Sequence, residues 1–165
     1  MYLNLLLIRH AKSSWIDPSL LDFDRPLNTR GKKNAPLMGK RILKYNLNLD
    51  LIISSAAMRA KTTAKLIAQE INFDLESIKY ESDLYHATKE VLFEVLSKQK
   101  KESIAIVGHN PGIQDFSNWL CLGPTVNFPT CGIVNITFNL DNWTEIYRNC
   151  GSITFFEYPK MFTSI

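Results

Sequence analysis

Histidine and arginine side chains follow three of the apolar segments that the sequence predicts as buried strands. Arg9 and His10 follow the first of these segments. Arg59 comes shortly after the second, and His109 follows the third. Arginine presents a planar fork of N–H donors that fits phosphate oxygens, and histidine can donate a proton or attack as a nucleophile. Two arginines and two histidines in one pocket would therefore suit the binding of a dianionic phosphoryl group.

The apolar segments alternate with helical patterns along most of the chain. Strands are expected at Leu3–Ile8, Leu51–Ser54, Ile78–Tyr80 and Ser103–Val107, and helices at about 29–45, 58–71, 88–96 and 111–120. This alternation predicts a three-layer α/β/α sandwich with a mainly parallel central sheet. Ligands of such sheets bind outside the carboxyl ends of the strands, so the three basic segments are expected to converge at one edge.

Three parts of the chain do not fit a simple alternation of strands and continuous helices. Pro36 lies inside the helix expected at 29–45, and it predicts a kink or a later start because proline lacks the N–H that a helix interior needs. The segments 132–140 and 152–158 are rich in β-forming residues and are expected to add edge or antiparallel strands. Residues 11–28, which contain two X-Pro pairs and several aspartates, are expected to form a loop.

The composition is typical of a soluble globular protein. The chain has 165 residues, 45% hydrophobic and 21% charged, which suits one compact domain over residues 1–165. The net charge of +3 suits an anionic substrate, but no dense basic run indicates binding to nucleic acid. No segment approaches the length of a membrane span, and the three cysteines lack CxxC spacing. A cytoplasmic enzyme with unpaired thiols is therefore expected.

Four short motifs resemble branch 1 of the histidine phosphatase superfamily. Residues 7–14 (LIRHAKSS) are similar to its opening Arg-His-Gly motif, with Ala11 in place of the glycine. Residues 54–64 are similar to its second signature, and residues 107–110 to its third. Residues 25–31 (RPLNTRG) are similar to the segment after the first motif in SixA-type phosphohistidine phosphatases. The resemblance covers essentially the whole chain and implies a phosphoglycerate mutase-like fold.

This resemblance implies a role for each basic residue. His10 matches the nucleophile that becomes phosphorylated, and His109 matches the second histidine of the pocket. Arg9 and Arg59 match the two arginines that bind the phosphoryl oxygens, and Arg25 is implied as a further contact. The resemblance implies neither a cofactor nor a metal. We expect a neutral His10 that donates one ring proton to a backbone carbonyl, with its pKa lowered by the arginines.

The sequence leaves the proton donor open. Relatives that cleave phosphate esters often carry a glutamate in the middle of the chain, and His86 stands at the comparable place here. Glu81, Asp83 and Glu90 are alternatives, and His86 could instead only hold its loop. An alkoxide leaving group needs protonation in the transition state, whereas a protonated phosphoimidazole leaves as a neutral group. The lack of a clear acid therefore favours phosphohistidine in proteins as the substrate.

Three alternatives stay open at this point. A phosphomonoesterase or mutase for small sugar phosphates would use the same fold. A non-catalytic module would bind a phosphorylated protein without hydrolysing it. A metal hydrolase would use His10, His86 and His109 as ligands, although their spacing matches no HExxH motif. The sequence determines neither the oligomeric state nor the physiological partner.

Overall fold

A computed structural model describes residues 2–122 and 127–163, and its strands form one six-stranded sheet in the order β3-β2-β4-β1-β5-β6. The strands are β1 (Leu3–Arg9), β2 (Leu51–Ser55), β3 (Lys79–Glu81), β4 (Ser103–Gly108), β5 (Ile133–Phe138) and β6 (Ser152–Glu157). Strands β1 to β4 run parallel, whereas β5 lies antiparallel to β1 and β6 antiparallel to β5. The predicted mainly parallel sheet, extended by antiparallel strands, is confirmed.

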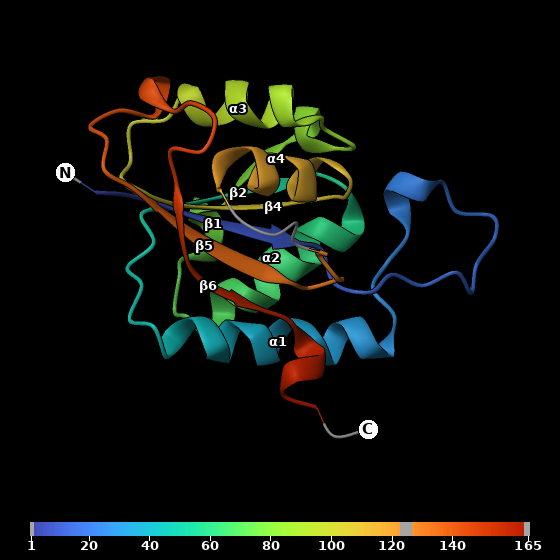
Figure 1. The fold of residues 1–165 in the computed structure, drawn as a ribbon. Helices are drawn as coiled ribbons and strands as arrows, with labels where there is room; N and C mark the ends of the chain where they lie inside the picture. Colours follow the sequence, from blue (N-terminus) through green and yellow to red (C-terminus); the bar gives the residue numbers. More distant parts are fainter. Residues whose placement is uncertain (1, 123–126, 164–165) are drawn as a thin grey trace.

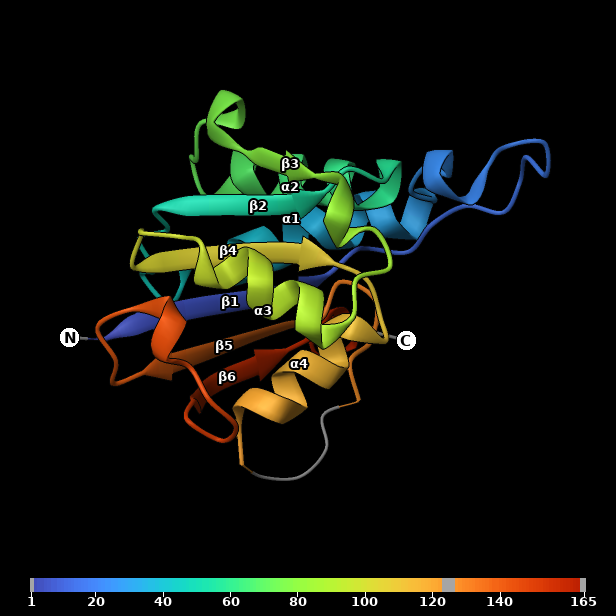
Figure 2. The same cartoon turned by 90° about the horizontal axis from the view of Figure 1, so that it is seen from above.

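Helices cover both faces of this sheet. They are α1 (Thr29–Leu43), α2 (Met58–Glu70), α3 (Lys89–Ser97) and α4 (Gly112–Leu120). Helices α1 and α2 lie on one face, and α3 and α4 lie on the other (Figures 1 and 2). Side chains alternate along β1, so that Leu6 and Ile8 pack toward α1 and α2 while Leu5 and Leu7 pack toward α3 and α4. This double burial explains the continuous apolar run and confirms the three-layer sandwich.

Helix α1 begins at Thr29 and contains Pro36, so a later start of this helix is wrong. Asn28 caps the helix, because its side-chain oxygen accepts a hydrogen bond from the N–H of Gly31 at 2.8 Å. Proline removes only one N–H donor from the helix. The side chain of Met38, two residues after Pro36, is fully buried. The cap and the packing of this face therefore keep the helix continuous across the proline.

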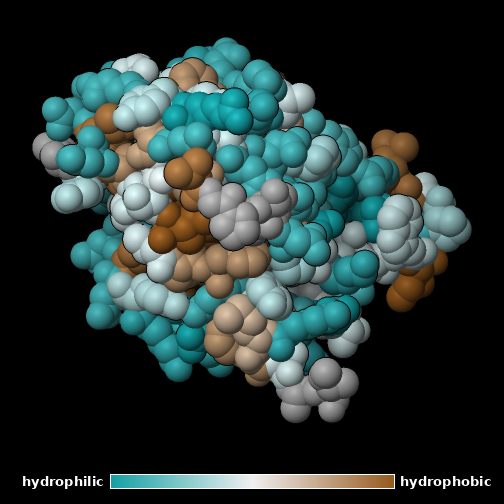
Figure 3. Space-filling view, viewed as in Figure 1, coloured by the Kyte–Doolittle hydropathy of each residue, from teal (hydrophilic) through white to brown (hydrophobic). Residues whose placement is uncertain are grey.

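The segment between β1 and α1 extends away from the body of the molecule (Figure 1). We call residues 14–24 the projecting loop; they end in a 3-10 turn over Asp22–Asp24. The base of the loop is closed by a hydrogen bond from the Ser14 N–H to the Pro26 carbonyl at 2.8 Å. Hydrophobic atoms are visible on its surface in Figure 3, and Trp15 and Ile16 are 74% and 91% exposed.

The cysteines agree with the expectation of unpaired thiols. All three are free; Cys121 and Cys131 are buried and Cys150 is partly buried. Burial raises the pKa of the Cys131 thiol to about 12, which keeps it protonated and unreactive. Within residues 2–122 and 127–163, no helix is both long and apolar enough to cross a lipid bilayer.

Candidate active site

His10 follows β1 directly and is buried, with 8% of its surface exposed. Its N–H donates to the Gly108 carbonyl at 3.0 Å, which continues the pairing of β1 with β4 beyond the strand end. Its ring Nδ1 lies 2.7 Å from the carbonyl oxygen of Ala11. A proton on Nδ1 is therefore donated to that carbonyl, and the lone pair of Nε2 faces the pocket. This is the orientation expected of a neutral histidine nucleophile.

Arg59 reaches the same pocket from the first turn of α2. Its guanidinium is buried, and Nε donates to Nε2 of His10 at 3.4 Å. Thr63, one turn further along α2, accepts a hydrogen bond from the N–H of Ala11 at 3.0 Å. The hydroxyl of Thr63 in turn donates to the carbonyl oxygen of Arg59 at 2.7 Å. Thr63 thereby fixes the segment that carries His10 against the helix that carries Arg59.

His109 enters the pocket from the end of β4 and is 3% exposed. Its ring centroid lies 5.0 Å from that of His10. Nε2 of His109 lies 2.8 Å from the hydroxyl of Ser55, which itself accepts the N–H of Ala57. When Ser55 donates its own proton to Nε2, the ring proton of His109 lies on Nδ1. Among the described residues, this buried Nδ1 has no hydrogen-bond partner.

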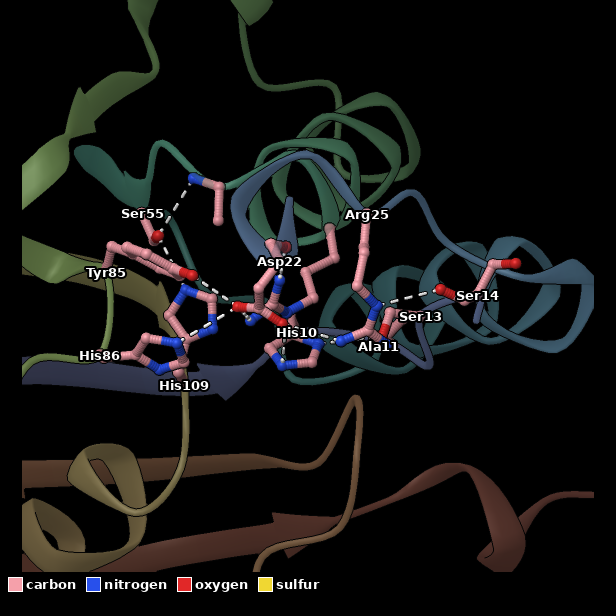
Figure 4. A network of polar contacts seen from close by, with 12 residues as sticks. His10, Ala11, Ser13, Ser14, Asp22, Arg25, Ser55, Tyr85, His86 and His109 are labelled. Carbon is pink, nitrogen blue, oxygen red and sulfur yellow. Dashed lines mark hydrogen bonds and ion pairs between the residues drawn. The ribbon is translucent and has the colours of Figure 1, made fainter. Parts of the chain in front are cut away.

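Arg25 and His86 are two further basic side chains at this edge of the sheet. Arg25 is buried, and its Nη2 donates to the hydroxyl of Ser13 at 2.6 Å. The ring of His86 lies 5.3 Å from the ring of His109, and its side chain is 55% exposed. We call His10, Arg25, Arg59, His86 and His109 the basic cluster, most of which Figure 4 shows together.

Arg9 occupies a different position from the other predicted site residues. Its Nη1 donates to the carbonyl oxygen of Phe128 at 3.0 Å. The charge of Arg9 nevertheless acts on the pocket, because it contributes to the lowered pKa of His10. Within the described parts of the chain, no hydrogen bond joins Arg9 to the basic cluster. Its role as a phosphate ligand therefore stays a prediction.

Both buried histidines are held neutral. The pKa of His10 is lowered to about 4, mainly by burial and in addition by the charges of Arg59, Arg9 and Arg25. The hydrogen bond with the Ala11 carbonyl acts in the opposite direction and raises this pKa. Burial also lowers the pKa of His109 to about 3, with His10 and Arg59 contributing further. The predicted lowering of the pKa of His10 is confirmed. Desolvation lowers this pKa more than the arginine charges, which were the cause expected from the sequence.

Two residues that the sequence did not single out lie within the basic cluster. The carboxylate of Asp22 accepts hydrogen bonds from Arg25 at 2.9 Å and from Arg59 at 3.0 Å. The hydroxyl of Tyr85 donates to the same carboxylate at 2.5 Å. The hydrogen bond from Tyr85, followed by those from Arg59 and Arg25, holds the pKa of Asp22 well below its usual range. The only signal for Asp22 in the sequence is its position three residues before Arg25.

The candidate carboxylic acids do not reach the basic cluster. Within residues 2–122 and 127–163, no hydrogen bond or ion pair joins Glu81, Asp83 or Glu90 to it. His86 does reach it, because its Nε2 lies 3.3 Å from the carboxylate of Asp22. Over the same residues, no three His, Cys, Asp or Glu side chains are grouped so that they could hold a metal ion.

Comparison with known proteins gives consistent matches. A family model described as the histidine phosphatase superfamily (branch 1) matches residues 5–86. An uncharacterised chloroplastic protein of Arabidopsis thaliana is 29% identical over 157 residues, which cover 89% of this chain and 72% of that protein. A crystal structure from Agrobacterium tumefaciens, assigned as the phosphohistidine phosphatase SixA, is 26% identical with a TM-score of 0.79, over 95% of this chain and 98% of that one.

A further solved structure supports the fold alone, because its identity to this chain is only 19%. It is the protein histidine phosphatase SixA complexed with tungstate, with a TM-score of 0.81 over 98% of this chain and 100% of that one. The sheet order and the helical layers described above are therefore those of the phosphoglycerate mutase-like fold.

Proposed function

The chain belongs to branch 1 of the histidine phosphatase superfamily, and from this premise we propose that it hydrolyses phosphoryl groups through a phosphohistidine intermediate on His10. The orientation of the His10 ring is the observation that carries the proposal. With Nδ1 held 2.7 Å from the Ala11 carbonyl and Nε2 next to Arg59, a neutral imidazole presents one lone pair to the pocket. A histidine needs this arrangement to act as a nucleophile.

In the first proposed step, Nε2 of His10 attacks phosphorus while the bond from phosphorus to the leaving group breaks. The electron pair of that bond passes to the leaving group; for a phosphohistidine substrate this is an imidazole whose ring already carries a proton, so that it departs as a neutral group. The transition state is loose and in line, with its charge on three equatorial oxygens. Arg59 and Nδ1 of His109 supply N–H donors to these oxygens. By analogy with oxyanion donors, each contributes about 3–4 kcal/mol to the stabilisation of the transition state.

In the second step, a water molecule attacks the phosphoryl group on His10 from the opposite side. The P–N bond breaks, inorganic phosphate forms, and the ring returns to its neutral form hydrogen bonded to Ala11. We propose that no metal ion takes part. Arginine side chains supply the positive charge that a metal would otherwise bring to the phosphoryl oxygens.

Phosphohistidine in a protein is the proposed substrate. Among the described residues, Asp22 is the carboxyl group that hydrogen bonds with the basic cluster, and its lowered pKa keeps it ionised at neutral pH, so it is a poor proton donor. A protonated phosphoimidazole leaves as a neutral group and has least need of such a donor. The similarity to the structure assigned as SixA supports the same substrate class. The proposed partner is therefore a phosphorylated protein, met in the cytoplasm.

The test is a substrate panel in the presence of excess chelator, combined with trapping of labelled phosphate. We expect phosphohistidine peptides to turn over faster than sugar phosphates, and acid-labile label to accumulate on the wild-type protein but not on His10→Ala. An acid-stable label on another residue would overturn the intermediate. Faster turnover of sugar phosphates would overturn the substrate class, and loss of activity with chelator would overturn metal independence. Phosphoprotein binding without any turnover would identify a non-catalytic module.

A further inference from the structure

The carboxylate of Asp22 occupies the centre of the basic cluster (Figure 4). Its Oδ1 accepts from Arg25 at 2.9 Å, and its Oδ2 accepts from Arg59 at 3.0 Å and from Tyr85 at 2.5 Å. Oδ2 also lies 3.3 Å from Nε2 of His86. The backbone carbonyl of Asp22 takes another N–H of Arg59, at 2.6 Å. Asp22 thus accepts hydrogen bonds from both terminal nitrogens of Arg59 and from one terminal nitrogen of Arg25.

These contacts are those that an incoming phosphoryl group needs. A phosphoryl dianion and a carboxylate both bind an arginine fork through two oxygens, so they compete for the same N–H donors. Both are negative, and two like charges that share one pocket repel each other. A phosphoryl group and the Asp22 carboxylate therefore cannot occupy the space between Arg25 and Arg59 together.

We propose that Asp22 is an internal competitor for the phosphoryl group: its carboxylate occupies the anion site of the free enzyme and is displaced when substrate binds. The proposal rests on the proposed function, since it assumes that the phosphoryl group binds beside His10. It makes Asp22 a residue that determines specificity. A ligand must supply enough contacts to replace those of Asp22, so free phosphate and small phosphate esters bind weakly, whereas a large phosphoprotein has further surface with which to bind.

The position of Asp22 in the fold allows this displacement. The side chain is 41% exposed on the outer side of the pocket, at the start of the 3-10 turn that ends the projecting loop. Leu21, immediately before it, is 72% exposed, so little apolar packing holds this end of the loop. Phe23 makes one edge-to-face contact with Tyr85, with 5.0 Å between ring centroids. Withdrawal of the turn therefore breaks mainly the polar contacts that a phosphoryl group replaces.

The experiment measures inhibition of the full-length protein by inorganic phosphate, with an aryl phosphate as substrate. Asp22→Asn removes the charge at nearly constant shape, and Asp22→Ala removes the competing group altogether. We expect both variants to lower the Ki of phosphate about tenfold, which corresponds to about 1.4 kcal/mol. The Ki of phosphate is the deciding quantity, because Asp22 hydrogen bonds Arg59 and the variants therefore also alter a group that the proposed chemistry uses.

Asp24→Asn is the matched control. Asp24 lies in the same 3-10 turn and carries the same charge, but it is exposed, and its side chain makes no hydrogen bond or ion pair with the basic cluster among the described residues. Its Ki for phosphate is expected to equal that of the wild-type protein. An equal decrease in this variant would indicate a general effect of net charge and would overturn the assignment to Asp22.

Other outcomes also overturn the proposal. An unchanged or higher Ki in both Asp22 variants would mean that the carboxylate only positions the two arginines. A fall in kcat confined to substrates with poor leaving groups, with unchanged Ki, would make Asp22 a proton donor instead. If the wild-type protein hydrolyses nothing, the proposed function fails, but calorimetric titration with phosphate still measures whether the Asp22 variants bind it more tightly.

Discussion

The hydroxyl of Thr63 provides a sharp test of how the pocket is assembled. It is fully buried, accepts the N–H of Ala11 at 3.0 Å and donates to the carbonyl of Arg59 at 2.7 Å. Thr63→Val keeps the shape of the side chain but leaves the N–H of Ala11 buried without an acceptor. Such a loss costs about 1–3 kcal/mol. The carbonyl of Arg59 loses less, because the helix itself also hydrogen bonds that oxygen.

The matched control is Thr62→Val in the same helical turn. The hydroxyl of Thr62 also donates to the carbonyl four residues earlier, that of Met58, at 2.9 Å, but Thr62 is only half-buried. In the described part of the chain it accepts no hydrogen bond from the segment after β1. The two variants therefore change helix propensity equally. The difference in their free energies of unfolding isolates the contact with Ala11.

We expect Thr63→Val to lower the free energy of unfolding by about 2 kcal/mol relative to Thr62→Val, and the melting temperature by roughly 4–8 °C. Its kcat/KM for an aryl phosphate should fall at least about tenfold, because His10 and Arg59 lose their common anchor. Urea unfolding and initial rates measure both quantities, and Thr63→Ser should retain most of each. Equal stability and equal kcat/KM in the two valine variants would refute this account of the pocket.

Three further predictions concern stability. His10 and His109 protonate near pH 6.5 in the unfolded chain but near pH 4 and pH 3 when folded, so each should lower the free energy of unfolding by about 3 kcal/mol as pH falls from 7 to 4, as measured by urea titration at each pH. Gly31→Ala should destabilise the folded protein despite the better helix propensity of alanine, because the added Cβ would overlap the Lys12 carbonyl oxygen. A lower melting temperature in thermal unfolding would show this loss of stability. Glu157→Gln weakens the ion pair with Arg41, which has two hydrogen bonds, and should lower the free energy of unfolding in urea by about 2 kcal/mol. The kcat/KM of this variant should stay within about twofold of the wild-type value.

The sequence by itself determined the layers and the edge of the sheet at which the pocket lies. Residues 5–8 of β1 are all apolar because α-helices cover β1 on both faces, and this kind of pattern can be recognised without knowledge of distant partners. The convergence of His10, Arg59 and His109 followed from the parallel order of the strands that precede them. The orientation of His10 also follows locally, since its hydrogen-bond acceptor is the next residue.

Only the tertiary structure decided which charged groups meet. Asp22 binds Arg59 and Tyr85, which lie 37 and 63 residues away along the chain, and no periodicity connects such positions. The guanidinium of Arg9 donates to the carbonyl of Phe128, 119 residues away, which no sequence pattern indicates. The depth of burial that dominates the pKa of His10 is likewise set by packing. Hydrogen bonds and desolvation depend on distances in the folded chain, and these are fixed only when the layers pack together.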